Sequence, residues 1–153
     1  MSRSLWIVLA VALAAAPALA MSNGVISNFR GQLIVSKDDI PEGKNDHDTI
    51  AKIKSASLKE LDGEPRGEVT GWNFHYTAFL SKTGATSLKM EFLTSKDRRL
   101  SADKQLSNVD KNSAVLTGDI TIDEDEGLAK GKTYDVELLA GNTTVARTTI
   151  TFK

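Results

Sequence analysis

Residues 71–80 read Gly-Trp-Asn-Phe-His-Tyr-Thr-Ala-Phe-Leu, and this stretch decides the fold class. Its even positions, beginning with Trp72, are all apolar or aromatic, whereas Asn73, His75 and Thr77 stand between them. Alternation with a period of two residues indicates a β-strand that buries one of its faces. The large rings on that face predict a strand that crosses the core.

The same alternation recurs along the rest of the chain, in residues 31–37, 86–92, 116–122, 134–138 and 146–152. Turn-forming residues separate these runs, and the short link Ala140-Gly141-Asn142 predicts a hairpin. The charged stretch 95–109 predicts a short edge strand, because Lys and Arg keep a sheet edge from pairing with other chains. Strands at such short intervals predict a mainly β protein with two packed antiparallel sheets.

One segment departs from this pattern. Ile50 and Ile53 fall near helical spacing, and Asp46 or Asp48 can cap the first turn. The sequence therefore predicts one short helix near residues 47–56, with a short strand just after it.

A second spacing signal lies near the end of the chain. Leu128, Gly131 and Tyr134 follow one another at intervals of three residues, directly before an alternating run. This spacing resembles the tyrosine corner of immunoglobulin-like sandwiches, in which the hydroxyl bonds the chain a few residues upstream. It is also similar to fibronectin type III domains, although Lys130 stands where a proline is common. The resemblance covers mainly residues 115–153 and implies an Ig-like two-sheet sandwich.

The resemblance also implies structural roles for two aromatic residues. Trp72 would be the core tryptophan that these folds often have, and Tyr134 would pin the connection between the sheets. It implies no activity, because this fold hosts many unrelated functions.

The beginning of the chain has the three parts of a secretory signal peptide: a short positive head, an apolar run and small residues up to Ala20. The apolar run is about twelve residues long, whereas a bilayer-spanning helix needs about 20. The sequence therefore predicts a signal peptide at residues 1–20 and a single β-sandwich domain at 21–153. Its Ala-rich character predicts export into a bacterial periplasm or out of the cell, with no membrane span after cleavage. A translational start at Met21 is the alternative.

The composition excludes several functional classes. The 153 residues carry a net charge of -1 without a basic block, which argues against nucleic-acid binding. The chain has no Cys and only two histidines, His47 and His75, so neither a disulfide scaffold nor a His-based metal site is expected. The motifs of serine hydrolases, zinc proteases and phosphate-binding loops are missing. We therefore expect no enzyme activity, no catalytic residue and no cofactor.

Two groups of polar residues are candidates for binding. Asn73 and His75 share the strand face opposite Trp72, where they could hydrogen-bond a sugar that stacks on an aromatic ring. The alternative is an ordinary, partly covered surface. Asp123 and Asp125 could supply oxygens to a calcium ion, but their loop lacks the calcium-loop signature, so we expect no metal there. A solvated acidic turn is the alternative for this loop.

Together these observations predict a secreted or periplasmic, non-catalytic binding or interaction module. It would act through loops or one sheet face on a protein or a glycan. The alternative is a structural or assembly component of the cell envelope or extracellular matrix, which would work through an unprotected strand edge at residues 31–37 or 143–152. A small hydrolase is disfavoured.

Overall fold

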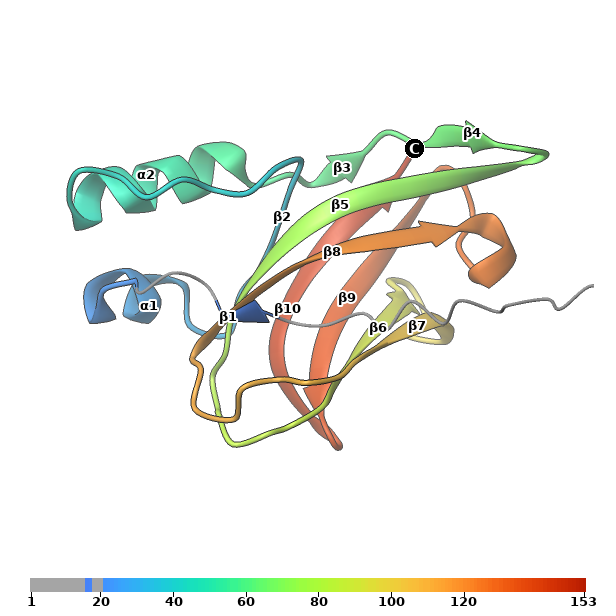
Figure 1. Ribbon diagram of the computed structural model, residues 1–153. Coiled ribbons are helices and arrows are strands. Elements are labelled where there is room, and N and C mark those ends of the chain that lie inside the picture. Colours follow the sequence, from blue (N-terminus) through green and yellow to red (C-terminus); the bar gives the residue numbers. More distant parts are fainter. Residues whose placement is uncertain (1–15, 18–20) are drawn as a thin grey trace, which may run out of the picture.

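The computed structural model describes residues 16–17 and 21–153 (Figure 1). The signal peptide predicted at residues 1–20 lies outside the described residues, except for Ala16 and Pro17. The helices are α1 (Asn23–Phe29), α2 (Asp46–Ala56) and the 3-10 turn η1 (Glu124–Glu126). The strands are β1 (Ala16–Pro17), β2 (Leu33–Ser36), β3 (Glu60–Leu61), β4 (Glu64–Arg66), β5 (Val69–Phe79), β6 (Leu88–Thr94), β7 (Leu100–Leu106), β8 (Val115–Asp123), β9 (Lys132–Ala140) and β10 (Thr143–Phe152).

The strands form two sheets that pack face to face (Figure 1). One sheet has the order β1-β8-β5-β2, with β4 also paired to β5, and the other has the order β3-β10-β9-β6-β7. The strand order is that of an immunoglobulin sandwich. In one sheet, β5 and β8 take the places of strands B and E, and in the other, β6, β9 and β10 take those of strands C, F and G. The predicted mainly β, Ig-like two-sheet architecture is confirmed, and the charged stretch 95–109 does hold an edge strand, β7.

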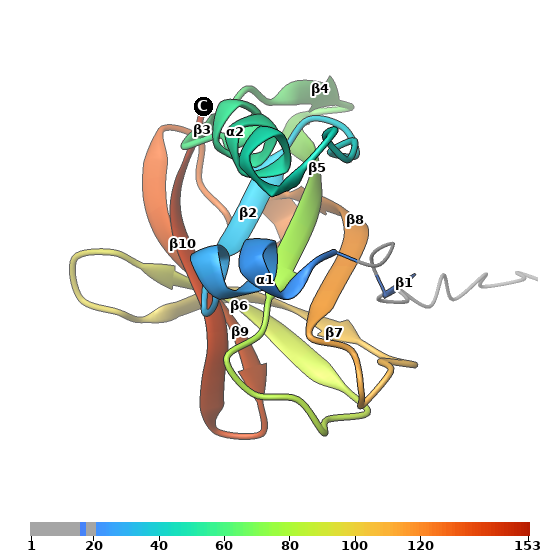
Figure 2. The same ribbon diagram turned by 90° about the vertical axis from the view of Figure 1, so that its left-hand side faces the viewer.

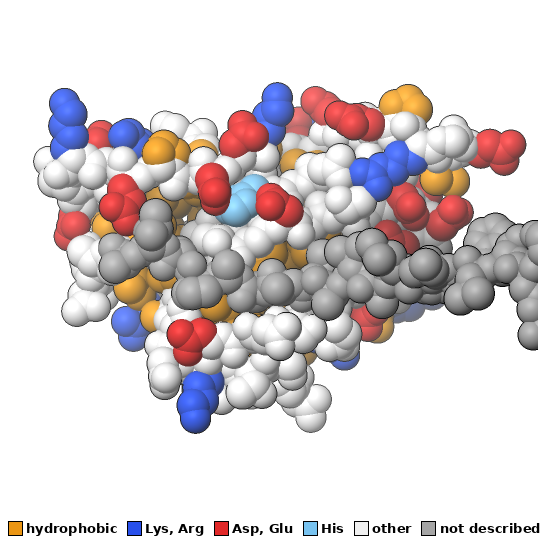
Figure 3. Space-filling view, viewed as in Figure 1, with side chains coloured by type: hydrophobic (Ala, Val, Ile, Leu, Met, Phe, Trp, Pro, Cys, Tyr) orange, Lys and Arg blue, Asp and Glu red, His pale blue; other side chains and the backbone are white. Residues whose placement is uncertain are grey.

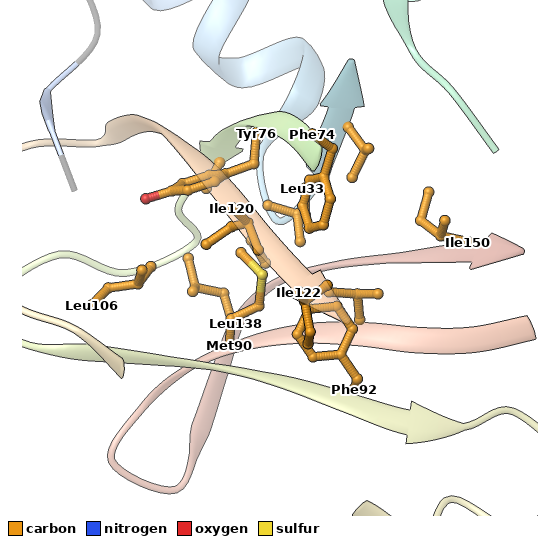
Figure 4. Packing of buried hydrophobic residues seen from close by; sticks show 14 of the residues in the cluster. Leu33, Phe74, Tyr76, Met90, Phe92, Leu106, Ile120, Ile122, Leu138 and Ile150 are labelled. Atoms are coloured by element: carbon orange, nitrogen blue, oxygen red, sulfur yellow. The ribbon is translucent and has the colours of Figure 1, made fainter. Parts of the chain in front are cut away.

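The main core lies between the two sheets (Figure 4). It contains every even position of the alternating stretch 71–80, from Trp72 to Leu80. Phe152 occupies its centre, with ring centroids 5.4 Å from Trp72 and 5.7 Å from Tyr134. The indole Nε1 of Trp72 donates to the carbonyl of Lys153 at 3.0 Å, which satisfies its one polar group inside the core.

The tyrosine corner is formed as the spacing predicts. The backbone N–H of Ala129 donates to the hydroxyl of Tyr134 at 2.8 Å. Leu128 is buried beside it, and Gly131 adopts a φ of 83°, which favours glycine. This hydrogen bond fixes the path by which the chain crosses from β8 to β9.

Both helices lie at one end of the sandwich (Figure 2). They bury a second, smaller apolar cluster against the outer side of β2 and β5. Its members are Val25 and Phe29 of α1, Ile53 of α2, Ile34, Phe79 and Val115. The helices therefore cover one end of the outer face of β5 and bury Phe79 there, as in the partly covered alternative for this face.

Helix α2 matches the predicted helix, but the expectation of a single helix is wrong, because α1 precedes it. Asn23 and Gly24 have low helix propensity, which hides this helix in the sequence. It forms because Ser22 caps it, accepting from the N–H of Val25 at 3.3 Å, and because Val25 and Phe29 are both buried. Tertiary burial outweighs local preference here.

The two segments proposed as open strand edges are both covered. The N–H of Leu58 donates to the carbonyl of Val35 at 2.7 Å, along the free side of β2. The N–H of Arg147 donates to the carbonyl of Gly31 at 3.1 Å, so β2 and β10 join the sheets at this side. The far end of β10 pairs with β3. Neither segment therefore offers the unprotected edge that would favour the assembly alternative.

Candidate functional site

A groove of about 960 Å³ lies between the helical end of the molecule and the outer face of β9 and β10. Its walls come from the end of α1, from β2 and from the end of α2. Its floor is formed by side chains that alternate with the core residues Val136 and Ile150, and so point away from the core. Its charged lining residues are Lys54, Lys59, Arg98, Asp135, Glu137 and Arg147.

The floor of the groove holds a buried carboxylate. The side chain of Glu137 is only 9% exposed and lies 2.7 Å from the guanidinium of Arg98, which also contacts Asp135 at 3.0 Å. The hydrogen bond to Glu137 raises the pKa of Arg98 above its usual range. Arg98 reaches this position from the turn between β6 and β7, where its own backbone is left-handed with a φ of 54°. One arginine thus fixes two carboxylates, and its side chain remains half exposed to a ligand.

Three further cations face the groove. Lys59 donates to the hydroxyl of Thr148 at 3.2 Å, and Arg147 lies directly opposite Glu137 in the β9–β10 pair. Within the described part of the chain, neither they nor Lys54 form an ion pair. The lining holds four positively charged side chains and two carboxylates, so its net charge is +2. The whole chain, by contrast, has a net charge of -1. The groove is therefore a basic site on an acidic protein.

The predicted ligand residues lie on the opposite sheet, away from this groove. His75 is 5% exposed. Its Nε2 lies 2.8 Å from Asp39 and its Nδ1 3.0 Å from Asp119. Figure 3 shows the pale blue imidazole with acidic side chains on both sides. A ligand would have to displace one of these aspartates to reach a ring nitrogen.

Asn73 is exposed, but its carbonyl oxygen is already engaged. It accepts from the guanidinium of Arg66 at 2.6 Å and from the hydroxyl of Thr121 at 2.7 Å. The aromatic ring expected beside it, that of Phe79, is buried under α1 with its centroid 5.1 Å from that of Phe29. The structure does not bring Asn73 and His75 together with an exposed aromatic plane.

The acidic turn at Asp123 and Asp125 fastens β8 to neighbouring elements. Glu124 accepts the backbone N–H of Thr70 at 2.9 Å. Hydrogen bonding from the side chain of Thr70, and then from its backbone, lowers the pKa of the Glu124 carboxyl. Glu126 pairs with Lys104 on β7. A group of three or more His, Asp or Glu side chains that could hold a metal ion does not occur in residues 16–17 and 21–153.

The sequence did not reveal the groove. Its lining comes from α1, β2, α2, the β6–β7 turn, β9 and β10, so only the tertiary structure brings it together. Even the cross-strand pairing of Glu137 with Arg147 has no local signal, because a register shift between Thr144 and Ala146 creates it.

Comparisons with known proteins add a likeness in fold. No protein-family model matches the chain, and no curated protein matches its sequence. Among solved structures, it is similar to an immunoglobulin-like protein from Pseudomonas aeruginosa, with 11% identity and a TM-score of 0.40, over 80% of this chain and 90% of that one. In the part that the structure describes, no helix is both long and apolar enough to cross a bilayer.

Proposed function

We propose that the protein is an exported, non-catalytic binding module whose ligand site is the groove over β9 and β10. The ligand is an extended acidic partner, either a segment of a protein or a glycan. The observation that supports this proposal is the surplus of positive charge in the groove of a chain whose net charge is negative. A concave site that concentrates one sign of charge attracts ligands of the opposite sign.

The groove also offers directional contacts. Arg98 is held in place by Glu137 and Asp135, so its remaining donors are already oriented before a ligand arrives. Hydroxyls of Thr149 and Thr151 line the floor beside it. Preorganised donors reduce the entropy that is lost on binding. The site therefore suits a ligand that carries carboxylates and hydroxyls along an extended chain.

Thermal unfolding with and without polymeric ligands tests this proposal. We expect polyglutamate or polygalacturonate to raise the melting temperature, and a neutral glucan to leave it unchanged. A ligand at about a hundred times its Kd adds roughly 2.7 kcal/mol. That shifts the melting temperature of a domain of this size by several degrees. The shift should decrease as salt is added, because ions screen exposed charges.

Two matched triple variants locate the site. Replacing Lys54, Lys59 and Arg147 by Gln should abolish the shift. Replacing the exposed lysines Lys82, Lys96 and Lys111, which do not line the groove, changes the net charge equally and should preserve it. Equal losses in both variants, or no shift in the unmodified protein, would refute the groove as the binding site.

Export is supported by the composition of residues 1–20. N-terminal sequencing of the protein that accumulates in a bacterial periplasmic fraction tests it. We expect the sequence to begin Met-Ser-Asn-Gly, from Met21 onwards. An intact chain that begins at Met1 and stays in the cytoplasm would contradict export.

A further inference from the structure

One long strand of the sandwich, β8, has a side on which only two of the described residues, Ala16 and Pro17, pair with it. Along its other side it pairs with β5 over its full length, from Val115 to Asp123. β8 holds the position of strand E in an immunoglobulin sandwich, where strand D pairs with the other side of strand E. Here the chain passes from β7 to β8 through residues 107–114 without forming a strand. Among the described residues, only the two-residue strand β1 lies at this edge (Figure 1).

The pairing with β1 shows that this edge accepts a strand. Ala16 lies opposite Thr117 and Pro17 opposite Leu116, in antiparallel register. These are small, uncharged residues, and Pro17 has no N–H to donate. Only a short extended segment is needed to occupy this part of the edge.

A buried hydroxyl points to the same place. Tyr76 on β5 lies opposite Gly118 on β8, and a Cβ on Gly118 would lie 2.8 Å from the tyrosine ring. The ring therefore crosses β8 at its glycine and carries its hydroxyl toward the edge of the sheet. Figure 4 shows this hydroxyl at the margin of the core, directed away from the other labelled side chains.

Within the described residues, the hydroxyl of Tyr76 has no hydrogen-bond partner, although the residue is only 1% exposed. Burial, together with the charge of Asp119, raises the pKa of Tyr76 well above its usual range, so the group stays protonated and can donate. A buried donor without a partner is costly and is therefore uncommon. Its position at the unpaired edge indicates that something docking there supplies the acceptor.

We propose that the edge of β8 from Val115 to Asp119 is a strand-addition site for an extended segment of small, uncharged residues from a partner polypeptide. The docked strand pairs antiparallel with β8, and one of its carbonyls accepts the hydroxyl of Tyr76. In the unprocessed chain, Ala16 and Pro17 take this place. Strand addition gives affinity through the backbone.

This site is separate from the groove of the proposed function. β2 walls the groove at one edge of the sheet, whereas β8 lies at the other edge, beyond β5. Failure of either proposal leaves the other intact.

Hydrogen exchange of residues 21–153, followed by NMR, tests the site. Both apolar clusters of the described residues lie from Met21 onwards, so residues 21–153 contain both of them. The probe is a synthetic peptide of residues 13–20, with one added lysine for solubility. We expect it to slow exchange of the amides of Thr117 and Asp119 about tenfold or more, because these amides point to the free edge and become hydrogen-bonded. The amides of Leu116 and Gly118, which point toward β5, should change little.

Two variants that each remove one phenolic hydroxyl make the test specific. Tyr76→Phe should weaken peptide binding about fivefold, the effect of one lost hydrogen bond. Tyr134→Phe removes a hydroxyl that is already bonded to Ala129, and should leave the affinity unchanged. Equal effects of the two variants would contradict the role assigned to Tyr76.

The unmodified protein alone can overturn the proposal. Unchanged exchange along β8 at saturating peptide, or protection that maps only to the other free edge at β7, would refute a strand-addition site on β8. Protection of β8 that grows with protein concentration in the absence of peptide would identify a second copy as the occupant and refute the partner proposed here.

Discussion

The guanidinium of Arg98 lies 2.7 Å from the carboxylate of Glu137 and shields it from solvent at the floor of the groove. The side chain of Arg98 is 53% exposed and that of Glu137 is 9% exposed, so only the carboxylate depends on its partner to compensate for lost solvent. Removing the arginine leaves a buried charge without its partner, and that penalty exceeds the small value of an exposed ion pair.

Arg98→Met should therefore lower the free energy of unfolding, because it leaves the buried carboxylate of Glu137 without its partner. Arg98→Met combined with Glu137→Leu should cost less than the sum of the two single changes, because the unpaired charge is gone. Chemical denaturation of the three variants measures this coupling. Arg99→Met serves as the control, because Arg99 is 80% exposed and should change stability by less than about 0.5 kcal/mol. Strict additivity would show that Glu137 does not depend on Arg98.

Tyr134→Phe should destabilise the protein by about 1 kcal/mol, because the N–H of Ala129 loses its acceptor while the ring stays in the core. Urea denaturation at neutral pH measures the change. A loss near zero would mean that the tyrosine corner contributes packing and no hydrogen-bond energy.

Tyr76→Phe should have the opposite sign in residues 21–153. It removes a buried hydroxyl that lacks a partner among the described residues, and should stabilise the domain by about 1 kcal/mol. The same denaturation experiment measures it beside Tyr134→Phe. A destabilisation would show that this hydroxyl is bonded in the free domain, for example to an internal water.

Glu124 should contribute to the pH dependence of stability. The hydrogen bond from Thr70 lowers the pKa of its carboxyl below the ordinary 4.5, so the folded state favours the ionised form. Its stabilisation is therefore present above the unfolded pKa and is lost as the pH falls through the folded pKa. Glu124→Gln should melt at a lower temperature than the unmodified protein at pH 7, and the difference should shrink below about pH 4.

Glu68→Gln is the matched control for the pH series, because Glu68 is an exposed glutamate on the neighbouring turn. Its melting curve should follow that of the unmodified protein from pH 7 to acid. A constant difference for Glu124→Gln at every pH would mean that ionisation of Glu124 does not stabilise the fold.

Gly127→Ala should be more damaging than Gly131→Ala. Both glycines have a positive φ, of 119° and 83°, which strains any other residue. At Gly127 an added Cβ would also lie 1.9 Å from the carbonyl oxygen of Ser101, whereas nothing lies within 4 Å at Gly131. We expect a loss of about 1 kcal/mol for Gly131→Ala and more than about 2 kcal/mol for Gly127→Ala. Equal losses in thermal unfolding would show that the chain moves away from Ser101.

The strands could be predicted because alternation is a local property, and the buried side of β5 follows from the sequence of residues 71–80 alone. Helix α1 could not be predicted, because Asn23 and Gly24 disfavour a helix. The Ser22 cap and burial of the helix against Ile53 and Phe79 stabilise it instead. These same contacts bury the ring of Phe79, which the alternation alone places on the face of His75.

The candidate site was less predictable than the fold. The charge of Asp135, Glu137 and Arg147 indicates an ordinary solvated strand face, and only the position of the helices turns that face into a groove. His75 is a similar case, because Asp39 joins it from a loop whose position no local pattern predicts.

The parallel pairing of β3 with the end of β10 sets the order of events during folding. Glu60 and Leu61 find their partners only at Thr151 and Phe152, so this pairing cannot form until those two residues have been synthesised. Contacts between such distant residues form slowly, because a long loop must close first. Until that loop closes, β3 and the end of β10 lack each other as partners, and the sheet stays incomplete along this edge.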